Sequence, residues 1–105
     1  MKTKTRMINN AFVVSLEGEV DLATSPTARK EILRALQEGD TYVDLAAVSY
    51  MDSSGVASLV EGYQLAKDKG RRFGLVGVAH AVRLVLELAS LDKVFPMYER
   101  VPGAD

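Results

Sequence analysis

The sequence predicts an α/β fold, in which residues 1–105 form a single domain with helices packed against a mixed β-sheet of four to five strands. Segments rich in β-branched and aromatic residues alternate along the chain with amphipathic segments of helical period. Glycines stand at many of the junctions between these segments. A length of 105 residues suits one domain with one continuous core.

Two strands are expected at the start of the chain, over about 5–8 and 11–17. The second reads Ala-Phe-Val-Val-Ser-Leu-Glu and ends at Gly18, which is typical of a strand. Asn9-Asn10 lies between the two segments and suits a hairpin turn. The two strands are therefore expected to pair with each other.

A first helix is expected from about Pro26 to Glu38. Proline suits the first helical position, and Gly39 suits a helix end. Thr24 or Ser25 is the expected N-cap, because hydroxyl side chains accept the free backbone N–H groups of a first turn. The predicted apolar stripe of this helix consists of Ala28, Ile32, Leu33, Ala35 and Leu36.

The middle of the chain predicts a strand, a polar turn, a second helix and another strand. Residues 42–45 read as a short buried strand, and 48–51 lead into Asp-Ser-Ser-Gly. Apolar side chains then repeat at helical spacing over about 54–69, until Gly70 ends the helix. Residues 73–76 read as the next strand.

The last part of the chain predicts a third helix over about 79–89 and a short strand over 94–98. Pro96 suits a sheet edge, because proline cannot donate to a strand ladder. Residues 99–105 are expected to form a loose tail, so the core is expected over about 10–98. The resulting order β-β-α-β-α-β-α-β implies parallel, right-handed crossovers in the second half.

The predicted third helix is apolar on more than one face. A helix that covers one side of a sheet needs only one apolar stripe. Two explanations remain open: either the C-terminal strand and tail cover the remainder, or the excess marks a docking or dimer surface.

Composition excludes several kinds of site. The chain has no cysteine, and His80 is its only histidine, so neither a disulfide nor a cysteine- or histidine-based metal site is expected. No cofactor is expected either. A net charge of -1 argues against direct binding of nucleic acid. With no signal sequence or membrane-spanning segment in its pattern, the protein is expected to be cytoplasmic and not inserted in a membrane.

Basic residues gather where the second helix is expected to end, at Lys67, Lys69, Arg71 and Arg72. Cations at a helix C-terminus complement the helix dipole, so this cluster is interpreted as a solvated helix end.

The turn at Asp52-Ser53-Ser54-Gly55 admits a structural and a functional interpretation. Asp and Ser are favoured helix caps, and Asp52 suits the positive end of the helix dipole. Gly55 fits less well, because glycine inside a helix costs about 1 kcal/mol relative to alanine. A glycine there permits another backbone or a ligand to approach closely. A serine hydroxyl at an exposed helix N-terminus is also well placed to receive phosphate.

Four segments of the chain resemble the STAS domain of anti-sigma factor antagonists. These segments are Gly18-Glu19-Val20-Asp21, Val43-Asp44-Leu45, Met51-Asp52-Ser53-Ser54-Gly55 and Phe73-Gly74-Leu75-Val76-Gly77. The similarity runs from about Asn10 to Tyr98. After Ser-Ser-Gly, the antagonists commonly continue Leu-Gly, whereas this chain has Val56-Ala57-Ser58, which adds a methyl group where a partner approaches the helix.

The resemblance implies that Ser53 is a phosphoacceptor in a protein-binding switch. In such switches an ATP-using anti-sigma kinase binds the unmodified antagonist, which frees a sigma factor for transcription. Phosphorylation ends this binding and a phosphatase restores it. A dimer is compatible with this interpretation. The residues expected to contact the partner are Asp21, Thr24, Asp52, Ser54, Gly55 and Ser58.

Two other functions were weighed against this one. STAS domains also occur as small cytoplasmic subunits of ABC transporters that move lipids between bacterial membranes, where the domain braces the ATPase. This alternative remains open from the sequence. An enzyme is not expected, because a nucleophilic Ser53 or Ser54 would need a base and neither serine lies in a Gly-x-Ser-x-Gly turn.

Overall fold

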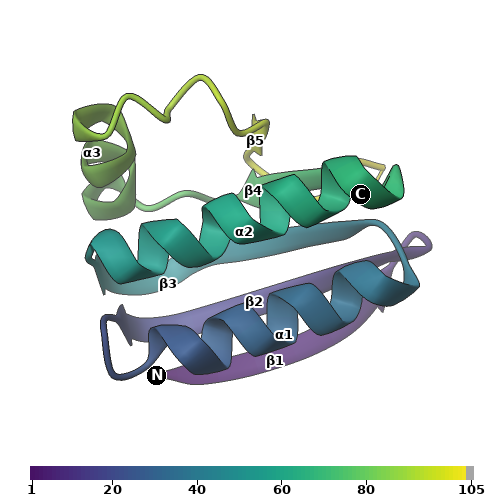
Figure 1. The fold of residues 1–105 in the computed structure, drawn as a ribbon, viewed down its shortest axis with the longest axis horizontal. Helices are drawn as coiled ribbons and strands as arrows, with labels where there is room; N and C mark the ends of the chain where they lie inside the picture. The colour runs from purple at the N-terminus through teal and green to yellow at the C-terminus, as the bar shows by residue number, and fades with distance from the viewer. Residues whose placement is uncertain (104–105) are drawn as a thin grey trace.

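The computed structural model describes residues 1–103 as a five-stranded sheet with three helices (Figure 1). The strands lie in the order β1-β2-β3-β4-β5; the first pair is antiparallel and the other neighbours are parallel. This confirms the predicted α/β class and element order. The elements are β1 (Lys2–Ile8), β2 (Ala11–Val20), α1 (Ser25–Glu38), β3 (Thr41–Met51), α2 (Ser53–Lys69), β4 (Phe73–Val76), α3 (His80–Leu88) and β5 (Met97–Tyr98).

The main core lies between the sheet and the helices. α1 and α2 run side by side along the sheet (Figure 1). Their inward side chains meet apolar residues of β2, β3 and β4 in one cluster. The largest fully buried members of that cluster are Leu16, Ile32, Leu36, Leu45, Leu59, Leu75 and Leu86. Burial of these side chains stabilises the fold by about 1.5–3 kcal/mol each.

The predicted hairpin is present, and its turn uses both asparagines. Asn9 and Asn10 have positive φ values of 54° and 66°, which suit the tight turns that match the twist of paired strands. β1 is longer than predicted and pairs from its first residue, with Lys2 opposite Glu17.

β3 is one strand of 11 residues, whereas the sequence predicts a break after Leu45. The predicted break coincides with an irregularity in the pairing of β3 with β2. At this irregularity Ala46 and Ala47 are both exposed. The Asp44 carboxylate holds this bulge: one oxygen accepts from the Ala46 N–H and the other from the Ser15 hydroxyl, both at 3.0 Å. The apolar alternation is therefore interrupted while the strand continues.

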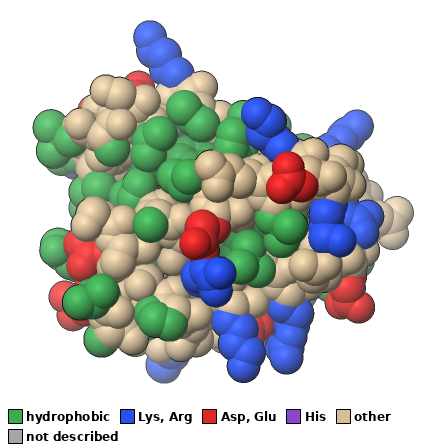
Figure 2. Space-filling model, viewed as in Figure 1, with side chains coloured by type: hydrophobic (Ala, Val, Ile, Leu, Met, Phe, Trp, Pro, Cys, Tyr) green, Lys and Arg blue, Asp and Glu red, His purple; other side chains and the backbone are tan. Residues whose placement is uncertain are grey.

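α3 keeps part of its apolar surface exposed. Val82 and Leu86 are buried in the core, whereas Leu84 is 45% and Leu88 is 88% exposed. The expectation that the C-terminal strand and tail would cover the remainder is therefore wrong for these two side chains. Figure 2 shows hydrophobic side chains gathered near α3, some of them between α3 and α2. The half-buried residues packed against the core from α2, α3 and the segment after them include Val60, Tyr63, Val85 and Leu91.

The C-terminal segment is more ordered than the sequence predicts. β5 is restricted to two residues, because the chain before it forms a turn that includes a bond from the Val94 N–H to the Leu91 carbonyl. Val101 is only 6% exposed and joins a second cluster with Val13 and Tyr42. The prediction of a loose tail over 99–105 is thus wrong for this part, while 104–105 lie outside the described residues.

The basic cluster lies at the end of α2, as predicted. Lys67 and Lys69 occupy its last turn, and Gly70 ends the helix with a positive φ of 66°. Arg71 has a further role. Its guanidinium donates to the carbonyls of Leu36 at 3.3 Å and Gln37 at 3.1 Å, near the end of α1. This side chain therefore satisfies free carbonyls of a neighbouring helix.

Candidate functional site

Two polar turns meet at the carboxyl ends of β2 and β3. These strands are parallel neighbours, and Val20 pairs with Met51 in their last register position. The Asp52 N–H then donates to the Val20 carbonyl at 3.1 Å, so the chain segments that follow both strands start side by side. The topology thus brings Asp21 and Asp52 to one edge of the sheet.

The first turn is held by Asp21 and Thr24. One carboxylate oxygen of Asp21 accepts from the N–H groups of Ala23 and Thr24, both at 3.0 Å. The Thr24 hydroxyl accepts from the Asp21 N–H and donates to the Glu19 carbonyl, both at 2.9 Å. Thr24 occupies the N-cap position of α1, as predicted, but its side chain does not make the expected capping bond there. Its hydroxyl closes the turn instead.

The second turn is capped by Asp52. Its Oδ1 accepts from the N–H groups of Ser54 at 2.9 Å and Gly55 at 3.3 Å, which confirms an aspartate cap at the start of α2. The Ser54 hydroxyl donates to the same oxygen at 2.5 Å. These bonds, led by that of the Ser54 hydroxyl, hold the pKa of Asp52 below its ordinary value of 3.8. The carboxylate is therefore stabilised in its charged form.

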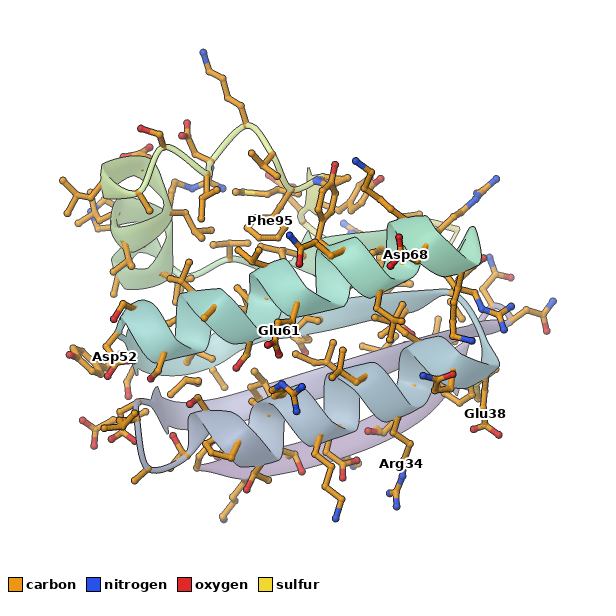
Figure 3. The ribbon with its side chains drawn as sticks, in the orientation of Figure 1. Arg34, Glu38, Asp52, Glu61, Asp68 and Phe95 are labelled. Carbon is orange, nitrogen blue, oxygen red and sulfur yellow. The ribbon has the colours of Figure 1, made fainter. Side chains whose placement is uncertain are left out.

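The two serines of the turn differ in their surroundings. Ser53 is the first residue of α2 and is exposed, and no hydrogen bond ties its hydroxyl to another of residues 1–103. Ser54 is half-buried and its hydroxyl is bound to Asp52. Figure 3 shows Asp52 at this end of α2. The geometry thus leaves the Ser53 oxygen accessible at a helix N-terminus, where backbone N–H groups favour an anion.

Gly55 and Ser58 lie below the surface that Ser53 occupies. A Cβ on Gly55 would stand 2.6 Å from Met51 Cγ and 3.1 Å from the Val20 carbonyl, so the glycine lets α2 approach both strands. Ser58 is 4% exposed, and its hydroxyl donates to the carbonyls of Ser25 and Ser54. Both residues are buried in the unbound chain and support the turn, while their contact with a partner remains a prediction.

A shallow groove of about 370 Å³ separates the starts of α1 and α2. Arg29 and Glu61 form an ion pair across it, and Figure 3 shows Glu61 on the side of α2 that faces α1. Ala57 lies on its wall and is exposed, so the methyl group that distinguishes this chain at that position faces solvent. The groove is lined by Ser25, Pro26, Arg29, Ser54, Ala57, Ser58 and Glu61.

Two apolar residues near the site are absent from the sequence-based list. Leu22 follows Asp21 in the first turn and is 78% exposed, while Tyr50 precedes the second turn and is 48% exposed. A leucine directly after Asp21 in a turn is an unusual choice for a surface loop, and this signal was available from the sequence.

Other kinds of site find no support in the part of the chain that the structure describes. No three side chains from His, Cys, Asp and Glu come close enough together within 1–103 to hold a metal ion. His80 is exposed at the start of α3. No helix among these residues has both the length and the apolar character to cross a membrane.

Comparisons with known proteins give one consistent result. The family description that matches the chain is the STAS domain, over residues 2–104. The anti-sigma F factor antagonist of Paenibacillus polymyxa is 30% identical over 96 residues, which cover 89% of this chain and 82% of that protein.

Two solved structures extend the comparison. An anti-sigma factor antagonist from Mycobacterium paratuberculosis is similar with a TM-score of 0.84 and 31% identity, over 95% of this chain and 86% of that one. The phosphorylated form of the Bacillus cell fate determinant SpoIIAA shares the fold with a TM-score of 0.73 at 21% identity, over 94% and 92% of the two chains.

Proposed function

The chain belongs to the STAS domain family and is an anti-sigma factor antagonist, and from this premise we propose that it is a phosphorylation-controlled switch with Ser53 as phosphoacceptor. As an antagonist it is a regulatory protein and not an enzyme. The unmodified form sequesters an anti-sigma factor kinase and so frees a sigma factor for transcription. Phosphorylation releases the kinase, and a phosphatase restores the unmodified form.

The observation that carries this proposal is the difference between the two serine hydroxyls. A kinase needs an accessible acceptor oxygen, and Ser53 offers one, whereas the hydroxyl of Ser54 is held by Asp52. A relative with the same fold has been solved in a phosphorylated form, which supports a covalent switch of this kind.

The electrostatics of the edge explain how one phosphate changes binding. A phosphoserine adds about -1.5 to -2 charges, which the N-terminus of α2 accommodates without a change of fold. The same charge would stand next to Asp52 on the chain, and Asp21 follows the neighbouring strand. An anti-sigma factor that fits an edge with two carboxylates then meets a strongly anionic surface, and its affinity falls.

The proposed contact set follows from exposure. Ser53 and the half-buried Asp21, Asp52 and Ser54 meet the partner, while Thr24 holds the first turn in place. A protein with this role acts in the cytoplasm, where sigma factors and their regulators are found.

The experiment is a phosphorylation assay with the cognate anti-sigma kinase and ATP, read by mass spectrometry of the intact chain and of its peptides. One phosphate is expected on Ser53. Ser53→Ala is expected to abolish it, and Ser54→Ala is expected to keep phosphate on Ser53 even where the loss of its partner contact slows the reaction. Phosphate on Ser54 alone would contradict the assignment.

A pull-down with the wild-type chain tests the partner. Recovery of an anti-sigma factor supports the switch, whereas recovery of an ABC-transporter ATPase and permease without an anti-sigma factor would favour the transporter alternative. The relatives named above are anti-sigma factor antagonists, so they lend that alternative no support.

A further inference from the structure

Two large apolar side chains are exposed at the edge of the sheet that carries Ser53. Leu22 is 78% exposed and Tyr50 is 48% exposed. Single apolar residues on a surface are ordinary, but a pair at one functional edge requires a reason. Most of the other exposed large hydrophobic residues lie elsewhere: Met7 on β1, Leu84 and Leu88 on α3, and Val94 and Tyr98 near β5.

Leu22 is held in a fixed place by the residues on both sides of it. The Asp21 carboxylate accepts from Ala23 and Thr24, and the Thr24 hydroxyl returns to the Asp21 N–H. Leu22 therefore lies at the tip of a turn that is closed on itself. An apolar side chain presented by a rigid turn loses little conformational freedom when a partner covers it.

Leu22 also lies next to the second turn. It follows Val20 by two residues, and the Val20 carbonyl accepts from the Asp52 N–H at 3.1 Å. Asp52 in turn precedes Ser53, the exposed first residue of α2. A partner that contacts both turns at this end of the sheet therefore covers Leu22 as well as the Ser53 hydroxyl.

Tyr50 is the second exposed apolar residue at this end of the sheet, and it belongs to β3. It pairs with Glu19 near the end of the β2–β3 ladder, two residues before Asp52. Leu22 and Tyr50 thus lie at the ends of two neighbouring strands, at the same end of the sheet as Asp21 and Asp52.

We propose that Leu22 is an anchor residue of the anti-sigma factor interface, which inserts into an apolar recess of that partner beside the group that reaches Ser53. The inference rests on the proposed function, since it assigns a second contact to the same partner. An apolar anchor next to the acceptor also strengthens the switch. Once the recess excludes water around this edge, a phosphate on Ser53 must lose hydration for the complex to form, which a charged group resists.

The experiment measures the Kd of the wild-type chain and of its variants for one partner. That partner is the anti-sigma factor recovered with the wild-type chain in the pull-down. Leu22→Ala is expected to raise Kd by about tenfold or more, as burial of a leucine side chain predicts. Leu22→Met, which keeps the apolar volume, is expected to stay within about threefold of wild type. Met7→Ala is the matched control: Met7 is 55% exposed and lies on β1, where it pairs with Phe12 far from the Ser53 edge.

The same variants test whether the Leu22 contact and the charge at Ser53 influence each other. The increase in Kd caused by Leu22→Ala is expected to be smaller in the Ser53→Asp background, because Leu22 cannot insert into the partner's recess next to the added charge. Thermal unfolding of each variant shows that the fold is intact, which the exposure of Leu22 leads us to expect.

The outcomes separate the two proposals. A Kd for Leu22→Ala within twofold of wild type overturns the anchor while phosphate on Ser53 still upholds the switch. A larger loss with Met7→Ala than with Leu22→Ala also overturns it. A wild-type chain that binds no anti-sigma factor overturns both.

Discussion

The Ser54 hydroxyl donates to Oδ1 of Asp52 at 2.5 Å, and this bond gives the two adjacent serines different chemistry. Ser54 is committed to the helix cap, while Ser53 faces solvent at the first position of α2. The same carboxylate oxygen also accepts two backbone N–H groups. The cap and the acceptor site are thus built from consecutive residues, and each can be tested separately.

The lowered pKa of Asp52 predicts a pH-dependent contribution to stability. Because the native pKa lies below its ordinary value of 3.8, the contribution is fully present above that pH and is lost as the pH falls through the native pKa. The stability advantage of wild type over Asp52→Asn, which keeps a capping side chain, is therefore expected to be constant from about pH 5 upward and to shrink below the ordinary pKa. Urea titrations from pH 2.5 to 7 measure it; an advantage that does not change with pH would contradict the role of the charge.

Gly55→Ala is expected to destabilise the protein although alanine favours helices. The added methyl would stand 2.6 Å from Met51 Cγ, which can move, and 3.1 Å from the Val20 carbonyl, which is backbone. The expected loss is about 1–3 kcal/mol, larger than the helix-propensity gain of about 1 kcal/mol. Chemical denaturation checks this value. A variant more stable than wild type would show that the close approach of α2 to β2 is not required.

Thr24→Val tests the closed turn without a change in side-chain volume. The hydroxyl both accepts from the Asp21 N–H and donates to the Glu19 carbonyl, and valine removes these bonds. We expect a loss of about 1–2 kcal/mol in the free energy of unfolding, at about 1 kcal/mol for each hydrogen bond. Thr24→Ser keeps the hydroxyl and is the control. Equal losses in the two variants would show that the methyl group, and not the hydroxyl, matters.

Val101→Ala tests the packed C-terminal segment. Val101 is 6% exposed against Val13 and Tyr42, so its truncation is expected to cost about 1–3 kcal/mol. Val94→Ala is the control, because Val94 is 39% exposed and its truncation is expected to cost about 0.5 kcal/mol or less. Thermal and urea unfolding measure both. Two equal, small effects would mean that the segment contributes little to the core.

The elements that the sequence predicts best are those whose ends are marked by a glycine or a turn. β4 has the predicted bounds, and α1 and α2 end next to Gly39 and Gly70 as expected. Gly70 ends α2 with a positive φ of 66°, which glycine adopts without strain, so this signal depends on no distant residue.

The elements that the sequence misses depend on tertiary contacts. The bulge in β3 is held by a bond between Asp44 and Ser15, which are 29 residues apart. The sequence around Val101 fits a loose tail and a packed tail equally well. Only the contacts of Val101 with residues from other elements distinguish the two. Local patterns carry no information on such pairings.

The candidate site also contains features that the sequence predicts and features that depend on tertiary contacts. The Asp52 cap follows from helix chemistry, whereas the meeting of the two acidic turns depends on the parallel pairing of β2 with β3. Sequence reasoning from the residues alone gives two serines with no preference between them, and the choice of Ser53 came from the family resemblance. The burial of Gly55 and Ser58 could not be seen either, since both contacts reach other elements. Ser53 as phosphoacceptor remains a prediction.

The strand order β1-β2-β3-β4-β5 repeats the order of the chain, and this has a consequence for folding. Each strand pairs with the strand synthesised before it, so a pair can form as soon as the hairpin turn or helix that connects its strands is complete. Such a sequence of near-neighbour contacts favours fast folding and a vectorial route during synthesis. The exception is Val101, which contacts Ala11 and Val13 near the opposite end of the chain. Its docking can follow only after these earlier residues are in place, because Val101 is the last residue of that cluster in the chain.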